Sequence, residues 1–172
     1  TLISSAAYEN LRVLCKTVGP RLAGSPGMLK AEAWARQALE TAGADKVWLQ
    51  ECMVPNWNRG GKDEAWYSSK DGKTVKKTPL DILALGNSMG TDPKGIYLQA
   101  ILINDFKELE AKKDAIKGKI VVFNNIFDPR NPGTFKSYVE TGTYRRAGPS
   151  MAAKYGASAL LIRSITGSTD NN

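Results

Sequence analysis

Histidine is absent from this sequence of 172 residues. Histidine is the usual general base near neutral pH, the usual partner of a catalytic serine or cysteine, and the commonest zinc ligand. The chain cannot build these sites from its own residues, so any such chemistry would need other residues or another polypeptide.

Cysteine is scarce, with Cys15 and Cys52 as its two occurrences. Two cysteines are too few for a disulfide framework, and their spacing lacks the paired C-x-x-C pattern of a zinc ribbon. They either pair with each other or remain free thiols. Because free cysteine is among the most often buried residue types, the sequence favours two buried free thiols.

Long apolar runs are missing as well. No stretch approaches the roughly 20 apolar residues that cross a bilayer, so we expect no membrane span. The first residues show neither the basic n-region nor the apolar h-region of a signal peptide, and we expect no such signal in this sequence.

Acidic residues are the minority, with 17 Asp and Glu against 24 Lys and Arg, for a formal net charge of +7. Clustered basic residues would favour nucleic-acid binding through phosphate contacts. Here the lysines of residues 62–77 and 107–113 are interleaved with aspartates and glutamates. That pattern is typical of a solvated face, and we expect no nucleic-acid partner.

Two amphipathic helices are predicted in the first part of the chain. Apolar residues recur at helical spacing from Leu11 to Val18, where Gly19 and Pro20 form a stop. Ser25 suits an N-cap with Pro26 at the first helical position, and a second apolar stripe runs over 31–42. Residues 47–54 predict a strand, and a lone strand points to a sheet whose other strands lie partly elsewhere.

The second part of the chain changes character at residues 57–61, where polar residues and glycines interrupt the periodicity. We place a boundary there, giving segments 1–55 and 56–172. A hairpin is predicted over 65–78 with Asp71 and Gly72 in its turn. Further strands are predicted at 81–85, 96–103, 119–124 and 157–165, and helices after an Asp105 and Glu108 capping box and over 144–155.

Strand, helix, strand, helix, strand is the order of a partly parallel sheet with right-handed crossovers. The fold class predicted for the whole chain is therefore mixed α/β (α+β). Only the tail at 167–172 is expected to be unstructured.

Three loops invite a functional interpretation. Residues 86–90 match the G-x-S-x-G nucleophile elbow around Ser88, but the chain has no histidine base and continues into a loop, so we expect a glycine-rich connection. The loop at 21–27 suits either an anion at a helix N-terminus or a tight capped turn, and the turn is favoured. Residues 128–133 suit either a contact loop after a strand or a surface connection, and the connection is favoured.

A series of segments resembles the carboxypeptidase Q family of two-zinc exopeptidases, also called plasma glutamate carboxypeptidases. In chain order the segments are RLAGS (21–25), WNRG (57–60), LGNSMGT (85–91), GKIVVFN (118–124), YRRAG (144–148), AAKYGA (152–157) and LIRS (161–164). No single segment is diagnostic, but together they span nearly the whole chain in the family's order.

The resemblance implies that residues 1–55 are the N-terminal segment of a zinc-peptidase domain. Residues 56–172 would be a protease-associated insert, truncated at its C-terminal end. The two zinc ions and the catalytic glutamate of the parent enzyme would lie outside the matched region. The resemblance thus implies no catalytic residue, no bound metal and no other cofactor within this chain. The implied partners are the remainder of the catalytic domain, a peptide substrate and a second copy in a homodimer. The implied location is extracytoplasmic, either secreted or periplasmic.

Three residues are candidates for facing the substrate cleft, namely Arg21, Ser25 and Arg59, because their loops adjoin the junction between the two segments. The alternative is that they brace this junction through hydrogen bonds to backbone carbonyls. The leading functional hypothesis is a non-catalytic portion of a zinc exopeptidase, an aminopeptidase or carboxypeptidase, whose insert shapes substrate access or dimer contacts. The second is a stand-alone peptide- or protein-binding module without enzyme activity.

Overall fold

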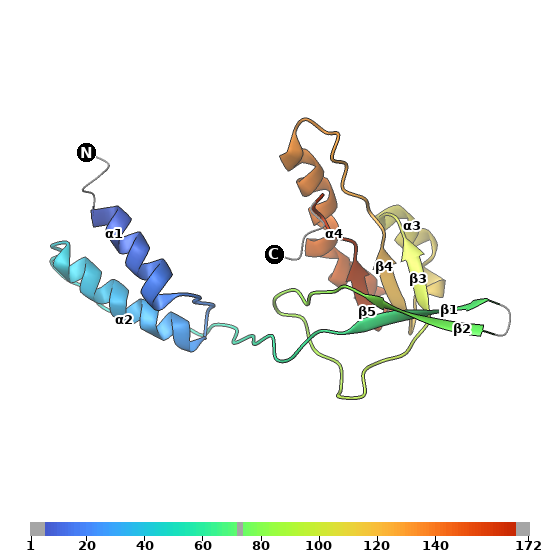
Figure 1. Cartoon of the computed structure of the whole chain (residues 1–172), viewed down its shortest axis with the longest axis horizontal. Helices are drawn as coiled ribbons and strands as arrows, with labels where there is room; N and C mark the ends of the chain where they lie inside the picture. Colours follow the sequence, from blue (N-terminus) through green and yellow to red (C-terminus); the bar gives the residue numbers. More distant parts are fainter. Residues whose placement is uncertain (1–5, 72–73, 168–172) are drawn as a thin grey trace. The chain divides into compact units, whose positions relative to one another are not determined.

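The computed structural model of the chain describes residues 6–71 and 74–167. These residues form helices, an antiparallel strand pair and a parallel sheet, which confirms the mixed α/β class (Figure 1). The chain divides into two compact units, Thr1–Gly90 and Thr91–Asn172. The assignment of residues 1–55 to a peptidase domain and of 56–172 to an insert stays a prediction.

The two helices predicted in the first unit are confirmed. Helix α1 (Ala6–Val13) continues as a π-helical turn (Leu14–Val18), which ends where the Gly19 N–H donates to the Leu14 carbonyl at 3.0 Å. Helix α2 (Pro26–Thr41) begins at its expected cap, because the Ser25 hydroxyl accepts from the Met28 N–H at 3.2 Å. This cap supports the interpretation of residues 21–27 as a capped turn.

The strands predicted at 47–54 and 81–85 are wrong, since both segments are irregular. A β-strand needs a neighbouring strand to satisfy its backbone, and the described part of the chain gives residues 47–54 none. In the second segment the backbone of Ala84 is satisfied by side chains, the carboxylate of Asp63 and the guanidinium of Arg59.

The predicted hairpin is confirmed in the first unit. Strands β1 (Ala65–Asp71) and β2 (Thr74–Leu80) pair antiparallel, from Ala65 opposite Leu80 to Asp71 opposite Thr74. The predicted turn residue Gly72 lies outside the described residues. The Lys77 ammonium lies 3.6 Å from the centroid of the Trp66 ring, a cation–π contact along this ribbon.

The second unit contains the predicted parallel sheet, with strand order β3-β4-β5. The strands are β3 (Ala100–Ile103), β4 (Ile120–Phe123) and β5 (Ala159–Ile162), shorter than the ranges predicted for them. Residues 96–99 are irregular, so the predicted strand at 96–103 keeps its last four residues. Helix α3 (Phe106–Ala111), followed by a 3-10 turn (Lys113–Ala115), and helix α4 (Thr134–Lys154) connect the strands.

Helix α3 is capped with a one-residue shift from the predicted capping box. The Asp105 carboxylate accepts from the Glu108 N–H at 2.7 Å, as predicted. The Glu108 carboxylate in turn accepts from the Asn104 N–H, also at 2.7 Å, where a capping box would use the N–H of Asp105. Hydrogen bonds from the Lys112 ammonium and then from the Asn104 N–H hold the pKa of Glu108 below its usual range.

Helix α4 begins at Thr134, well before the predicted start at 144. Phe135, Tyr138 and Val139 have helical spacing there, but poor helix formers such as Thr141 and Gly142 follow them. The side chains that this half buries are polar, Ser137 and Thr141, so apolar residues do not mark its buried face. Local side-chain contacts organise this half of the helix: the Ser137 hydroxyl donates to the Asp128 carbonyl at 2.9 Å, and Arg145 donates to the Tyr138 hydroxyl at 2.6 Å.

The core of the second unit lies on the sheet face that both helices cover. Six residues form its buried cluster: Ile103, Leu109, Ile116, Val121, Phe123 and Ala152. The register aligns Ile103, Phe123 and Ile162 across the three strands, so they share one face. Helix α4 approaches this face at Gly148, where an added Cβ would lie 3.1 Å from the Phe123 ring.

The two cysteines are free, as predicted, but both are exposed, so the prediction that they are buried is wrong. Cys15 lies in the π-helical turn and Cys52 in the irregular segment 47–54. Within the described residues the first unit buries one apolar residue, Ala31, and has no core that would cover either thiol. None of the helices among residues 6–71 and 74–167 is long and apolar enough to cross a membrane.

Candidate functional site

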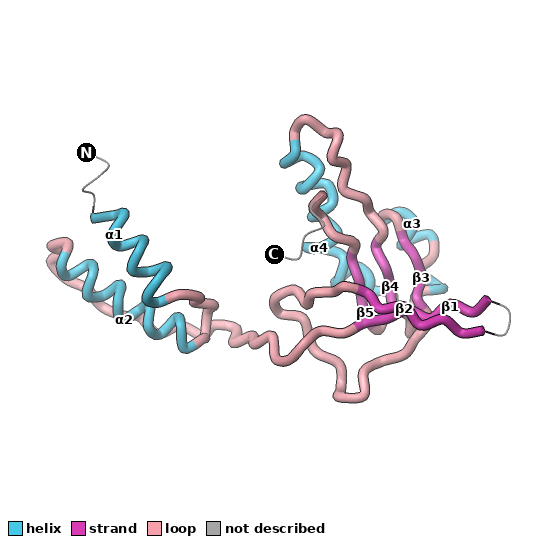
Figure 2. The backbone as a smooth tube through the Cα atoms, viewed as in Figure 1, coloured by secondary structure: helices cyan, strands magenta, loops and turns pink. Residues whose placement is uncertain are grey.

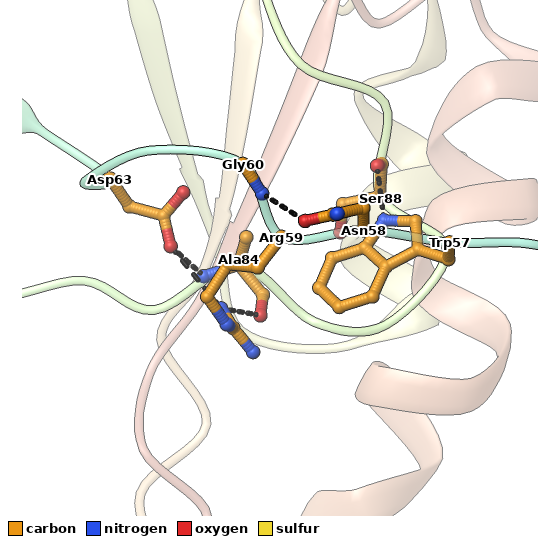
Figure 3. Close-up of polar contacts among 7 residues, drawn as sticks. All are labelled: Trp57, Asn58, Arg59, Gly60, Asp63, Ala84 and Ser88. Atoms are coloured by element: carbon orange, nitrogen blue, oxygen red, sulfur yellow. Dashed lines mark hydrogen bonds and ion pairs between the residues drawn. The ribbon is translucent and has the colours of Figure 1, made fainter. Parts of the chain in front are cut away.

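Two irregular segments of the first unit, residues 57–63 and 84–88, lie against each other (Figure 3). We call them the loop cluster. Their turn residues explain the lack of regular structure, because Gly60 has φ +74° and Asn87 has φ +67°. Asn87 occupies the third position of a turn closed by the Ser88 N–H and the Leu85 carbonyl at 3.0 Å. Asparagine and glycine are the residues that most readily adopt such positive φ angles.

Asp63 connects the two segments of the loop cluster. One oxygen of its carboxylate accepts from the Ala84 N–H at 2.8 Å and lies 3.3 Å from the Arg59 guanidinium. Arg59 also donates to the Ala84 carbonyl at 2.7 Å, so both backbone groups of Ala84 are held by side chains of the other segment. The Asp63 side chain is 22% exposed, which places this ion pair in a partly dehydrated position.

Trp57 forms a second connection within the loop cluster. Its indole N–H donates to the Ser88 carbonyl at 2.9 Å, and the Arg59 guanidinium carbon lies 5.2 Å from the Trp57 ring centroid. The Asn58 side chain accepts from the Gly60 N–H at 2.9 Å, a local turn that sets the path of the segment. Ser88 thus contributes its backbone carbonyl to the loop cluster. This contact fits a connecting loop, whereas a nucleophile would act through the side-chain hydroxyl.

The three candidate cleft residues are distributed as follows. Arg59 lies in the loop cluster, whereas Arg21 donates to the Gly19 carbonyl at 2.9 Å and Ser25 caps helix α2. The loop that carries Arg21 and Ser25 packs beside the start of the cluster, since an added Cβ on Gly24 would lie 3.1 Å from the Asn56 Cβ. Arg21 and Arg59 both bind backbone carbonyls, but Arg21 bonds a carbonyl two residues away and Arg59 one within residues 56–172. Their relation to the junction and to a substrate cleft stays a prediction.

The sequence did not reveal Asp63, which belongs to a stretch interpreted as a solvated charged face. Its main partner is the backbone of Ala84, 21 residues further along the chain. Because the partner is a backbone N–H, which almost every residue has, the sequence does not mark Ala84 as a partner. A pattern of side chains therefore could not predict this contact. The available signal was a pair of turn-rich segments, 57–61 and 86–90, that share one unit.

The loop after β4 outlines a shallow surface depression in the second unit, lined by Ile126, Phe127, Asp128, Pro129 and Arg130. Arg130 binds the Asp128 carboxylate through two nitrogens, at 3.0 and 3.2 Å. This hydrogen bonding from the side chain, and then from the backbone N–H of Arg130, holds the pKa of Asp128 below its usual range. The Arg130 charge is therefore paired with a carboxylate of its own loop. This pairing fits the interpretation of residues 128–133 as a surface connection.

Metal-ligand side chains do not gather in the described part of the chain. No group of three or more His, Cys, Asp or Glu residues lies close enough to hold an ion there. The donor set of these residues therefore does not fit a zinc site of the kind that uses three or four side-chain ligands.

We expect Asp63→Ala to destabilise the first unit by about 2 kcal/mol, because it leaves both the Ala84 N–H and the Arg59 guanidinium without their acceptor. Asp63→Asn keeps an oxygen for the Ala84 N–H and removes only an ion pair worth at most about 1 kcal/mol. Urea denaturation measures the free energy of unfolding of both variants. The indole N–H signal of Trp57 in NMR spectra reports whether the loop cluster keeps its structure. Equal losses from the two substitutions would show that the hydrogen bond to Ala84 contributes nothing.

Comparison with known proteins finds extensive sequence similarity. The chain is 37% identical over 159 residues to human carboxypeptidase Q and 38% identical over 160 residues to that of Xenopus laevis. These matches cover 92% and 93% of this chain and 31% of each relative. The resemblance to carboxypeptidase Q is thus confirmed, and the chain spans about a third of the relatives' length.

No family model matches the chain. Among solved structures, a zinc aminopeptidase from Bacillus subtilis aligns with 91% of this chain and 32% of its own, at 17% identity and a TM-score of 0.44.

Proposed function

We propose that this chain is a non-catalytic portion of a zinc exopeptidase similar to carboxypeptidase Q. The observation that carries the proposal is the similarity to carboxypeptidase Q over 92% of this chain and only 31% of the human relative. In this proposal residues 1–55 contribute to the peptidase domain and residues 56–172 form a protease-associated insert. Hydrolysis of a peptide from one end, as an aminopeptidase or carboxypeptidase, belongs to the whole enzyme.

The two zinc ions of that enzyme would be held by residues outside this chain, since the donors described above do not fit them. Zinc in such a site activates a water molecule and polarises the scissile carbonyl. The proposed role of this chain is to shape the surface around the cleft. The loop cluster suits this part because the Arg59 and Asp63 contacts fix the backbone of Ala84 without a regular sheet.

Arg21, Ser25 and Arg59 are proposed to border the cleft from the N-terminal side of the insert. Two of them also have a local structural role, in which Arg59 joins the two parts of the loop cluster and Ser25 fixes the start of α2. A homodimer contact through the insert and an extracytoplasmic location, secreted or periplasmic, complete the proposal. The stand-alone binding module has less support, because the first unit leaves large apolar side chains such as Trp48 and Met53 exposed.

The test uses the 172-residue chain and a hybrid in which this chain replaces the 159 matched residues of human carboxypeptidase Q. With zinc supplied, we expect the chain alone to leave dipeptides intact and the hybrid to hydrolyse them. A chelator should abolish the hydrolysis, and added zinc should restore it. Zinc-dependent turnover by the chain alone would contradict the proposal, as would a folded, zinc-loaded hybrid without activity.

A further inference from the structure

Polar residues follow all three strands of the parallel sheet directly. Asn104 comes after β3, Asn124 after β4 and Arg163 after β5. The hydrogen bonding of the sheet extends to two of them: the Asn124 N–H donates to the Ile103 carbonyl at 2.9 Å, and the Arg163 N–H to the Phe123 carbonyl at 3.0 Å. Parallel strands end at the same edge of a sheet, and Figure 2 shows the chain leaving β4 and β5 as loop there. The three residues therefore form a row along the carboxyl edge of the sheet.

Arg163 and Asn124 bind each other and leave several donor groups unused. The Arg163 guanidinium donates through Nη1 to the side-chain oxygen of Asn124 at 3.0 Å. Its Nε and Nη2 groups have no hydrogen-bond partner among the described residues, and the side-chain nitrogen of Asn124 has none there either. Arg163 is exposed and Asn124 is half-buried, so a ligand can reach both side chains.

Arg130 shows what the same two guanidinium groups bind elsewhere in this chain. Its Nε and Nη2 donate to the two carboxylate oxygens of Asp128, at 3.0 and 3.2 Å. This two-nitrogen fork matches the spacing of the oxygens in a carboxylate. The fork of Arg163 has no carboxylate partner within residues 6–71 and 74–167. Its positive charge is therefore unpaired in that part of the chain.

The other end of the row is already occupied. The Asn104 side chain donates to the Glu108 carboxylate at 2.9 Å, and Glu108 also binds the Lys112 ammonium. The row therefore keeps one guanidinium and one neutral amide as unused donors, which balance a single negative charge. A carboxylate has that charge and a planar pair of oxygens. A phosphate group carries about 1.5 to 2 negative charges near pH 7, more than one guanidinium offsets.

We propose that Arg163 and Asn124 form a binding site for a peptide carboxylate at the carboxyl edge of the parallel sheet. The fork of Arg163 holds the two carboxylate oxygens. Asn124 fixes the guanidinium through the existing hydrogen bond, and its amide N–H adds a further donor. The choice of a peptide as the bearer of the carboxylate rests on the proposed function. Its C-terminus and an acidic side chain offer the same chemistry.

Binding is measured by NMR titration of the 172-residue chain, followed at the Arg163 Nε–H and the Asn124 side-chain amide. The probes are acetyl-Ala-Ala with a free C-terminus, its C-terminal amide, an acetyl-glutamate amide with only the side-chain carboxylate, and inorganic phosphate, all at one ionic strength. We expect at least one of the two carboxylate probes to bind with a Kd of about 1–10 mM, as two charge-assisted hydrogen bonds allow. The amide of acetyl-Ala-Ala should not bind. The tighter of the two carboxylate probes identifies the source that the site prefers.

Substitutions test whether the fork makes the contact. Arg163→Gln should weaken binding at least about tenfold, and so should Arg163→Lys, which keeps the charge without the fork. Asn124→Asp supplies a carboxylate that should occupy Arg163 as Asp128 occupies Arg130, and it should abolish binding. Arg130→Gln is the matched control and should leave the Kd unchanged. Amide exchange at Phe123 reports in each variant whether the sheet is intact.

The proposal is overturned if acetyl-Ala-Ala and its amide bind equally and the glutamate probe does not bind, or if phosphate alone binds. Carboxylate binding that survives both Arg163→Gln and Asn124→Asp would also overturn it. Dipeptide hydrolysis by the hybrid with human carboxypeptidase Q is read separately. Carboxylate binding together with an inactive hybrid would sustain the site and remove the proposed function. An active hybrid and a chain that binds no carboxylate would do the reverse.

Discussion

Phe123→Ala is expected to destabilise the second unit by about 3–5 kcal/mol, the range for a phenylalanine truncated in a closed core. The Phe123 side chain is fully buried and packs against Phe106 and Tyr144, with ring centroids 5.5 and 5.0 Å away. Its neighbours cannot close the resulting cavity easily, because the Phe106 and Tyr144 rings also pack against each other at 4.9 Å. A loss of this size is a large part of the stability of a small unit.

The matched control is Phe135→Ala on helix α4, where the same side chain is 76% exposed. Its loss should stay within about 0.5 kcal/mol, as for most surface substitutions. Urea denaturation followed by near-ultraviolet circular dichroism, together with amide exchange at Val121, measures both variants. Similar losses from the two substitutions would show that the aromatic cluster around Phe123 does not stabilise the unit.

The second unit could be predicted well because its structure follows from local signals and a closed core. The apolar run at 120–123 became β4, and Asp105 became the N-cap of α3. Each strand is close in sequence to the helix that covers it, so the alternation of patterns carries the topology. The start of α4 escaped prediction because the side chains that its first turns bury are polar, such as Ser137, whose hydroxyl donates to the Asp128 carbonyl.

The first unit was predicted less well for a different physical reason. Its helices and hairpin have local caps and pairing, and both were predicted. The strand at 47–54 has the composition of a strand but no partner in the described residues, so composition alone could not produce it. The exposure of Cys15 and Cys52 has the same origin, because both predictions assumed a core that this unit does not contain.

The loop cluster shows what sequence patterns leave out of a candidate site. Arg59 was singled out for its place near the junction, whereas its bond to the Ala84 carbonyl joins two loops within residues 56–172. Asp63 and the Trp57 to Ser88 bond were not predicted, since both use backbone groups far along the chain. A hydrogen bond to a backbone group does not depend on the residue type of the partner. Only the fold shows which backbone group lies within reach of the side chain.

Gly27→Ala is expected to destabilise the helix pair by about 2 kcal/mol. An alanine inside a helix normally gains about 1 kcal/mol over glycine. At this position the added Cβ would lie 2.0 Å from the Pro20 carbonyl oxygen and 3.1 Å from its carbon. Overpacking typically costs about 1–3 kcal/mol, and here the cost falls at or above the upper end because a backbone oxygen cannot rotate away as a side chain can.

The clash would open the turn that joins the two helices. Residues 20–27 run from the stop after the π-helical turn to the first turn of α2, and Gly27 lets the chain pass close to Pro20. Amide exchange at Gly19 and Met28, which bond to Leu14 and Ser25, should therefore accelerate in the variant. Gly61→Ala is the control, because its added Cβ meets nothing within 4 Å. A Gly27→Ala protein as stable as the Gly61→Ala protein would contradict the close packing of this turn.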